Sequence, residues 1–132
     1  MGDEGNLAVV AAHMEGEATD PASVMALYTD DVLFEVPERA IALRDKGAIE
    51  ANYRGMFASI AGLSLAPCWR VAEGNKVQDL TVARFELTGD GFVRAPARVG
   101  DLVTLALHHV FVLRDGRIAR EIVHEEWRVA SP

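Results

Sequence analysis

Cysteine is almost missing from this sequence, since Cys68 is the only one among 132 residues. No disulfide can form within the chain, which is usual for proteins of a reducing compartment. Half of the residues are apolar, and this is enough for the core of one domain of ordinary length. We therefore expect a single domain over residues 1–132, stabilised by packing alone and located in the cytoplasm.

Basic residues are in the minority, with 13 lysines and arginines against 20 aspartates and glutamates, so the net charge is −7. A negatively charged protein repels the phosphate backbone, and we expect no nucleic-acid partner. Apolar runs are also short, because none approaches the roughly 20 residues that a membrane-spanning helix requires. The sequence therefore favours a soluble protein with no membrane partner.

Motifs that bind cofactors are missing as well. The sequence has no glycine-rich phosphate loop, no dinucleotide fingerprint and no nucleophile elbow. The spacing of His108, His109 and His124 matches no zinc-binding pattern. If the protein is an enzyme, we expect chemistry that uses neither a cofactor nor a metal.

The first half of the chain has the spacing of helices. Apolar side chains recur at helical intervals over residues 7–14. Asp20 before Pro21 is typical of a helix start, because aspartate caps free N–H groups and proline suits the first helical position. We expect that helix to run to about residue 28, followed by a strand over 32–36 and an amphipathic helix over 46–61.

The second half has strand character. Strands are predicted over 63–73, 77–88, 102–113 and 118–129, and turns that contain glycine separate most of them. Helices first and long strands later are typical of an α+β fold with an antiparallel sheet.

Four segments carry a family resemblance: 26–37, 46–49, 82–89 and 111–118. In this order and spacing the chain resembles the SnoaL-like polyketide cyclases and the wider nuclear-transport-factor-2-like group, which includes ketosteroid isomerases and limonene epoxide hydrolases. The resemblance implies a cone, made of a curved antiparallel sheet packed on N-terminal helices, with a pocket inside it. It does not select one reaction, because this fold hosts many functions.

His109 is the first candidate for a catalytic residue. On the strand over 102–113, alternate residues from Val103 to Leu113 are the bulkier and more apolar set, so we assign them to the core face. His109 belongs to this set and His108 to the other face. The resemblance implies that His109 stands where the polyketide cyclases have a general-base aspartate, and a neutral imidazole can also accept a proton near pH 7. The alternative is a histidine that only fills the cavity wall.

Arg84 and Glu86 are the other catalytic candidates, and they share a strand face. The resemblance implies a match to the Arg-x-Asp pair of the limonene epoxide hydrolases, which activates water and protonates the epoxide, with glutamate in place of aspartate. The second aspartate of that family aligns near Val123, beside His124, so the full set is absent. An ion pair within the sheet is the alternative.

The sequence resembles the ketosteroid isomerases but lacks their catalytic groups at the corresponding positions. Their base directly precedes a proline that corresponds to Pro37, where this chain has Val36, and Glu35 lies one residue earlier. The tyrosine that stabilises their dienolate aligns near Ala12, beside His13, and is lost unless the helix shifts by one residue. Glu35 remains a candidate for contact with a substrate.

Other predicted substrate contacts lie on the long helix and the last strand. Tyr53 and Phe57 belong to the apolar stripe of the helix, so Tyr53 should face inward, and His124 lies on the strand. An apolar cavity with a few polar groups suits a small hydrophobic molecule.

The sequence favours a cofactor-free acid–base enzyme of the cyclase or isomerase type that acts on a hydrophobic carbonyl compound, with His109 as base and Arg84 or Tyr53 beside the oxyanion. The alternatives are water addition to an epoxide through Arg84 and Glu86, and a binding or dimerisation module without catalysis. We also expect a homodimer, because the resemblance implies one and no predicted helix is left to cover the second sheet face.

Overall fold

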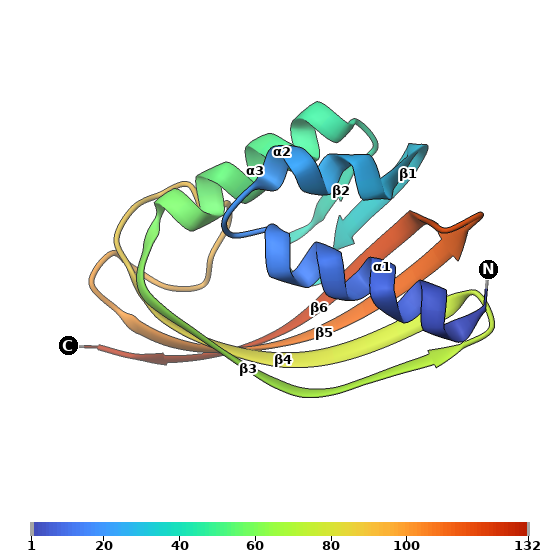
Figure 1. Cartoon of the computed structure of the whole chain (residues 1–132). Helices are drawn as coiled ribbons and strands as arrows, with labels where there is room; N and C mark the ends of the chain where they lie inside the picture. The colour runs from blue at the N-terminus through green and yellow to red at the C-terminus, as the bar shows by residue number, and fades with distance from the viewer. Residues whose placement is uncertain (1, 132) are drawn as a thin grey trace.

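The protein is described by a computed structural model over residues 2–131, in which helices cover one face of a strongly curved sheet (Figure 1). None of the helices in this range has the length and apolar character needed to cross a membrane. The helical elements are α1 (Asp3–Gly16), α2 (Pro21–Val24), η1 (Met25–Leu27), η2 (Pro37–Arg39) and α3 (Lys46–Ala58). The strands are β1 (Tyr28–Val36), β2 (Ile41–Leu43), β3 (Ile60–Glu73), β4 (Lys76–Leu87), β5 (Leu102–Arg114) and β6 (Arg117–Ala130).

Side-chain caps determine where the helices begin. The Asp20 carboxylate accepts a hydrogen bond from the Ser23 N–H at the start of α2, and Asp45 accepts one from the Gly47 N–H at the start of α3. The helix that we predict to run to about residue 28 is present as α2 and η1, which end at Leu27, whereas the strand predicted over 32–36 begins earlier, at Tyr28. This difference matters for the site, since it places Tyr28 on the sheet.

The six strands form one sheet in the order β2-β1-β6-β5-β4-β3. The α+β class is confirmed, with one refinement: β1 pairs with β6 in parallel, while the other neighbours are antiparallel. The pairing is possible because two helices and the hairpins of β3–β6 separate these strands along the chain. The sheet is therefore mixed and largely antiparallel.

Alternation along β4 and β5 separates an inner face from an outer face. Odd-numbered residues of both strands, from Val77 to Leu87 and from Val103 to Leu113, face the helices and are mostly buried. Even-numbered residues face outward and are partly or fully exposed. The assignment of His109 to the core face of its strand is confirmed, because only 3% of it is exposed.

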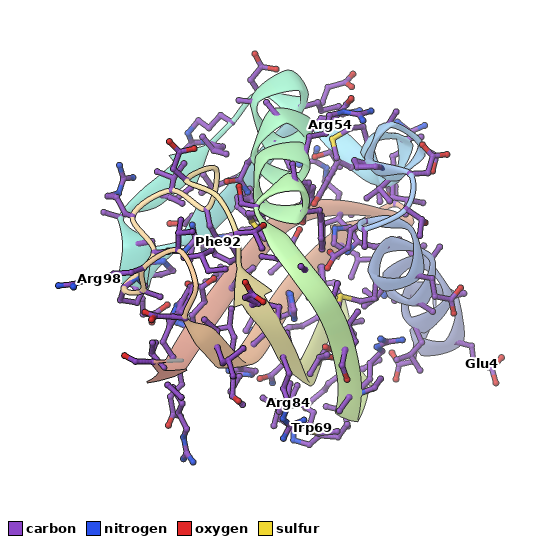
Figure 2. The ribbon with its side chains drawn as sticks, turned by 90° about the vertical axis from the view of Figure 1, so that its left-hand side faces the viewer. Glu4, Arg54, Trp69, Arg84, Phe92 and Arg98 are labelled. Carbon is purple, nitrogen blue, oxygen red and sulfur yellow. The ribbon has the colours of Figure 1, made fainter. Side chains whose placement is uncertain are left out.

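The loop over 88–101 folds back onto the inner face. Phe92 stacks on Phe85 with ring centroids 5.8 Å apart, and it meets the edge of Trp127 at 5.1 Å. Arg39 lies over the Phe92 ring at 4.6 Å and pairs with the buried carboxylate of Glu125. In Figure 2 Phe92 lies below the end of α3, between the loop and the sheet. This end of the interior is therefore filled by aromatic side chains.

Candidate functional site

A group of polar side chains lies in the interior between α1 and the sheet, at the end away from Phe92. Their burial is unusual, because charged groups are seldom buried unless they are paired. They come from α1, β1, α3 and the inner face of β4, β5 and β6, and comprise His13, Glu17, Tyr28, Tyr53, Asp79, Thr81, His109 and Glu121.

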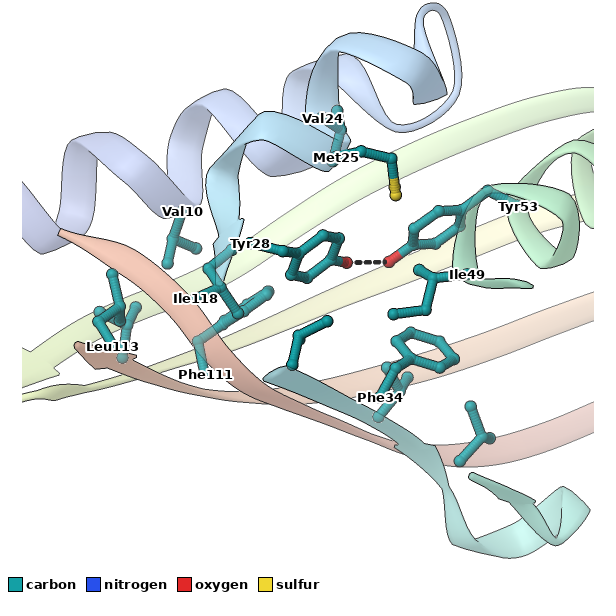
Figure 3. Close-up of a cluster of buried hydrophobic side chains, with 14 of the residues drawn as sticks. Val10, Val24, Met25, Tyr28, Phe34, Ile49, Tyr53, Phe111, Leu113 and Ile118 are labelled. Atoms are coloured by element: carbon teal, nitrogen blue, oxygen red, sulfur yellow. Dashed lines mark hydrogen bonds between the residues drawn. The ribbon is translucent and has the colours of Figure 1, made fainter. Parts of the chain in front are cut away.

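Glu121 is the centre of the first part of this group. It accepts hydrogen bonds from the Tyr28 hydroxyl at 2.5 Å and from the Tyr53 hydroxyl at 3.1 Å. His13 Nε2 lies 2.8 Å from the Tyr28 hydroxyl oxygen and 3.2 Å from Glu121 Oε1. Figure 3 shows Tyr28 and Tyr53 pointing toward one another from β1 and α3 within the apolar cluster. The cluster therefore holds one carboxylate with two hydroxyls and an imidazole, all shielded from water.

His13 lies between two carboxylates, with Nε2 near Glu121 and Nδ1 3.4 Å from Glu17 Oε2. Burial opposes a charge on this imidazole, but the carboxylates of Glu121 and Glu17 outweigh it and raise the pKa of His13 above its usual 6.5. Burial also acts on Glu121, and His13 outweighs it to lower the pKa of that carboxyl. The arrangement favours a charged pair of His13 and Glu121.

Glu17 is the least satisfied member of the cluster. Burial raises the pKa of its carboxyl, and neither Glu17 Oε2 nor His13 Nδ1 has a hydrogen-bond partner. One imidazole and two carboxylates have the composition of a metal site, and their ligand atoms lie within 4.8 Å of one another. The ring stands between the carboxylates with one nitrogen toward each, so an imidazolium provides a counter-charge to both without an ion.

The second part of the group surrounds Asp79. Its Oδ1 accepts a hydrogen bond from the Thr81 hydroxyl at 2.8 Å, and its Oδ2 accepts one from Arg70 Nε at 2.9 Å. His109 Nδ1 lies 3.5 Å from Asp79 Oδ1, and among the described residues it forms no hydrogen bond. Burial acts to raise the pKa of Asp79, but His109, Thr81 and Arg70 together lower it. Asp79 is thus an ionised carboxylate facing one nitrogen of a buried imidazole.

A cleft between the end of α1 and β3 leads to this carboxylate. Its volume is about 560 Å³, which is within the usual size of small-molecule sites. We call it the α1–β3 cleft; the residues that line it are Met14, Glu15, Ala18, Thr19, Leu65, Pro67, Cys68, Trp69, Arg70, Asp79 and Thr81. Asp79 and Thr81 line it from the inner face of β4, so the cleft reaches the edge of the polar interior at these two residues.

Arg84 and Glu86 do not join His109, which corrects their grouping into one cavity. Both are even-numbered residues of β4, so they face outward and are exposed, while His109 faces inward. They line an open groove on the outer side of the sheet with Thr104 and Arg128. In Figure 2 Arg84 projects below the sheet, on the side opposite to α3. The prediction that Arg84 and Glu86 share a strand face is therefore confirmed, but that face is the outer one.

The remaining predicted contacts are divided between the two faces. Tyr53 is buried and bonded to Glu121, and Phe57 is partly buried and stacks on Tyr53 at 6.4 Å. Glu35 faces outward and pairs with Arg120 at 2.7 Å. His124 is exposed, and its Nδ1 lies 3.3 Å from a Glu38 oxygen. Glu35 and His124 are therefore remote from the inner cluster and do not line the α1–β3 cleft, unlike the substrate contacts that we predict for them.

Sequence reasoning passed over most of the inner cluster. Asp79 and Glu121 were missed, although Asp79 alternates in phase with Val77, Ala83 and Phe85 and so falls on the apolar face of β4. This alternation with buried apolar residues is the feature of the sequence from which the inward orientation of Asp79 can be predicted. His13 is next to Ala12, the residue that aligns with the isomerase tyrosine. In the structure the side chain of His13 faces the interior and is fully buried.

Comparison with known proteins agrees with this architecture. The model of the SnoaL-like domain matches residues 10–121, so the chain belongs to the SnoaL-like domain family. A search of the curated proteins finds no match.

Three solved structures illustrate the range of similar folds. An LEH-like epoxide hydrolase from M. tuberculosis has 18% identity and a TM-score of 0.72, over 94% of this chain and 84% of that one. TerC, co-crystallized with polyporic acid, has 18% identity and a TM-score of 0.69, over 94% and 92%. A hypothetical protein from Catenulispora acidiphila with a ketosteroid isomerase-like fold, in complex with trimethylamine, has 15% identity and a TM-score of 0.67, over 89% and 82%. At these identities the likeness concerns the fold.

Proposed function

We propose that this protein binds a small, mostly apolar carbonyl compound through the α1–β3 cleft and moves a proton on it without a cofactor. His109 is the proposed base and Asp79 its partner. The observation that carries the proposal is the contact between His109 Nδ1 and the Asp79 carboxylate beneath a cleft with apolar walls. A buried imidazole beside a carboxylate is a common acid–base arrangement.

Asp79 would act by orienting His109. A carboxylate that faces Nδ1 favours the tautomer with a proton on that nitrogen, which leaves Nε2 free to accept another. Thr81 and Arg70 hold the carboxylate in place by hydrogen bonds. His109 would remove a proton from the carbon beside the carbonyl, giving an imidazolium and an enolate. The proton returns to another carbon in an isomerisation, or to the new alkoxide after an aldol ring closure.

The relatives support the binding of small molecules by this fold. The structures with polyporic acid and with trimethylamine each contain a small organic compound. Water addition to an epoxide through Arg84 and Glu86 has less support, because both side chains are exposed on the outer face. A binding module without catalysis would use the same cleft and differ only in the assay described below.

We also propose that the protein is a homodimer formed through the outer sheet face. Apolar side chains lie exposed on this face, with 43% of Trp69 and 54% of Val71 accessible, and no described helix covers them. Burial of such surface is the main driving force of association. Sedimentation equilibrium at micromolar concentration should give a dimer, and a monomer at that concentration would contradict this part of the proposal.

Proton exchange tests the catalytic part without knowledge of the product. Small cyclic ketones and 1,3-diketones are incubated in D₂O, and NMR follows the loss of the proton beside the carbonyl. We expect the protein to accelerate exchange for at least one probe, and His109→Gln to reduce that rate by about a hundredfold or more. His108→Gln is the matched control, because His108 is the neighbouring imidazole on the outer face, with its Nε2 3.0 Å from Gln78 Oε1. Equal rates for the two variants would refute the role of His109.

A further inference from the structure

Arg70 enters the interior from the edge strand β3 and uses only part of its guanidinium. Its Nε donates a hydrogen bond to Asp79 Oδ2 at 2.9 Å, while its terminal nitrogens have no hydrogen-bond partner within the described residues. The side chain is 26% exposed and lines the α1–β3 cleft. Two N–H-bearing nitrogens are therefore available at the opening of the site.

Arg39 shows what a purely structural arginine looks like in this fold. Its Nε and one terminal nitrogen donate to the two oxygens of Glu125, and the other terminal nitrogen donates to the Val93 carbonyl. All three nitrogens of Arg39 are satisfied, and the side chain is only 2% exposed. Arg70 differs in both respects, so its ion pair with Asp79 positions the guanidinium without exhausting it.

Among the described residues, Arg70 is the only cationic side chain that lines the cleft. Asp79 already accepts hydrogen bonds from Thr81 and Arg70, and Glu15 is exposed at the rim, where solvent screens its charge. The walls are formed by apolar side chains such as Met14, Leu65 and Pro67. The surroundings therefore combine one unsatisfied guanidinium with an apolar space.

We infer that the α1–β3 cleft selects small apolar molecules that carry a carboxylate, and that the terminal nitrogens of Arg70 bind this group. A planar guanidinium matches a carboxylate with two parallel hydrogen bonds, which lysine cannot reproduce. The inference rests on the proposed function for the location of the site and adds the substrate class: an acid whose apolar body reaches toward Asp79 and His109.

Three probes of nearly equal shape test this selectivity: 2-naphthoate, 2-naphthalenemethanol and 2-naphthylmethylammonium. Isothermal titration calorimetry of the full chain should show 2-naphthoate binding at least about tenfold more tightly than the alcohol. A hydrogen bond to a charged group is about twice as strong as one between neutral groups, and this difference in free energy corresponds to roughly tenfold in affinity. The ammonium probe should bind most weakly. Equal affinity for the anion and the alcohol would overturn the inference.

Variants assign the preference to Arg70. Arg70→Gln should remove the preference for the anion while leaving the affinity for the alcohol within about twofold, and Arg70→Lys should keep only part of it. Arg84→Gln is the control, because Arg84 is exposed on the outer face of the neighbouring strand. An anion preference that survives in Arg70→Gln would also overturn the inference. If Arg70→Gln does not fold, the affinities of the three probes for the unmodified protein still show whether the cleft prefers a carboxylate.

The result is separable from the catalytic proposal. Preferential binding of 2-naphthoate without any proton exchange on ketones would support the carboxylate site and contradict the enzyme. Proton exchange that depends on His109, with no preference for the anion, would do the reverse.

Discussion

Replacing Glu121 by glutamine removes one charge from the inner cluster and keeps the size of the side chain. In the native protein this carboxylate accepts hydrogen bonds from Tyr28 and Tyr53 and faces His13, and all four side chains are buried. Glutamine can accept one of the two hydroxyl bonds through its carbonyl, but its amide group faces donors. The imidazole of His13 also loses its closest counter-charge.

The magnitude follows from these losses. Breaking a buried ion pair by removing one partner usually costs about 3–5 kcal/mol of unfolding free energy, because the other group stays buried without compensation. The melting temperature of a domain of this length changes by about 3–5 °C per kcal/mol. We therefore expect Glu121→Gln to lower the midpoint of thermal unfolding by roughly 10–20 °C.

Urea unfolding followed by far-UV circular dichroism measures the loss of unfolding free energy, and thermal unfolding followed in the same way measures the shift in melting temperature. An unchanged dependence of the free energy on urea concentration would show that the native protein and Glu121→Gln expose the same surface on unfolding. Glu35→Gln is the matched control. Glu35 is also a strand glutamate with an ion-pair partner, but the pair with Arg120 lies on the outer surface, where such pairs contribute about 0–1 kcal/mol. A loss for Glu121→Gln no greater than that for Glu35→Gln would refute the account of the cluster.

Further predictions concern other charged groups and one glycine. The pKa of His13 is raised above its usual 6.5, so the contribution of the charged imidazole to stability is complete below about pH 6.5 and is lost as the pH rises through the folded-state pKa. His13→Gln should therefore flatten the decline in unfolding free energy above about pH 6.5, and an unchanged slope would contradict this. Arg39→Gln strands a buried carboxylate and should cost about 3–5 kcal/mol in urea unfolding. Gly91→Ala places a methyl group against the backbone of α3, so it should lower the melting temperature and loosen the loop over 88–101, seen as faster amide exchange there. Hydrogen bonds from Arg114 and Thr29 lower the pKa of Asp31 to about 2; NMR titration should find that value in the native protein and a higher one in Arg114→Gln.

The sequence was most informative where the signal is local. The cap at Asp20, the glycine turns and the alternation of His108 and His109 all depend on a few neighbouring residues, and the structure has these features. The parallel pairing of β1 with β6 could not be predicted in this way, because it joins strands that are distant along the chain.

The site was harder to predict because it unites residues from six elements. Alternation shows that Arg84 and Glu86 share a face, but only the phase of the whole strand shows that this face is the outer one. The cluster around Glu121 combines α1, β1, α3 and β6, and no spacing in the sequence reports such contacts. A charged residue in phase with buried apolar ones, as at Asp79, is the signal that sequence reasoning can use.

The positions of the four histidines permit the most direct test of where a ligand binds. His13 and His109 are buried on the inner side, whereas His108 and His124 lie on the outer face with ring centroids 6.0 Å apart. Titration with 2-naphthoate, followed by the ring C–H signals of all four histidines in NMR, separates the two faces. Our account predicts that the signal of His109 shifts, and that those of His108 and His124 do not. Shifts confined to His108 and His124 would place the ligand on the outer face and contradict the account.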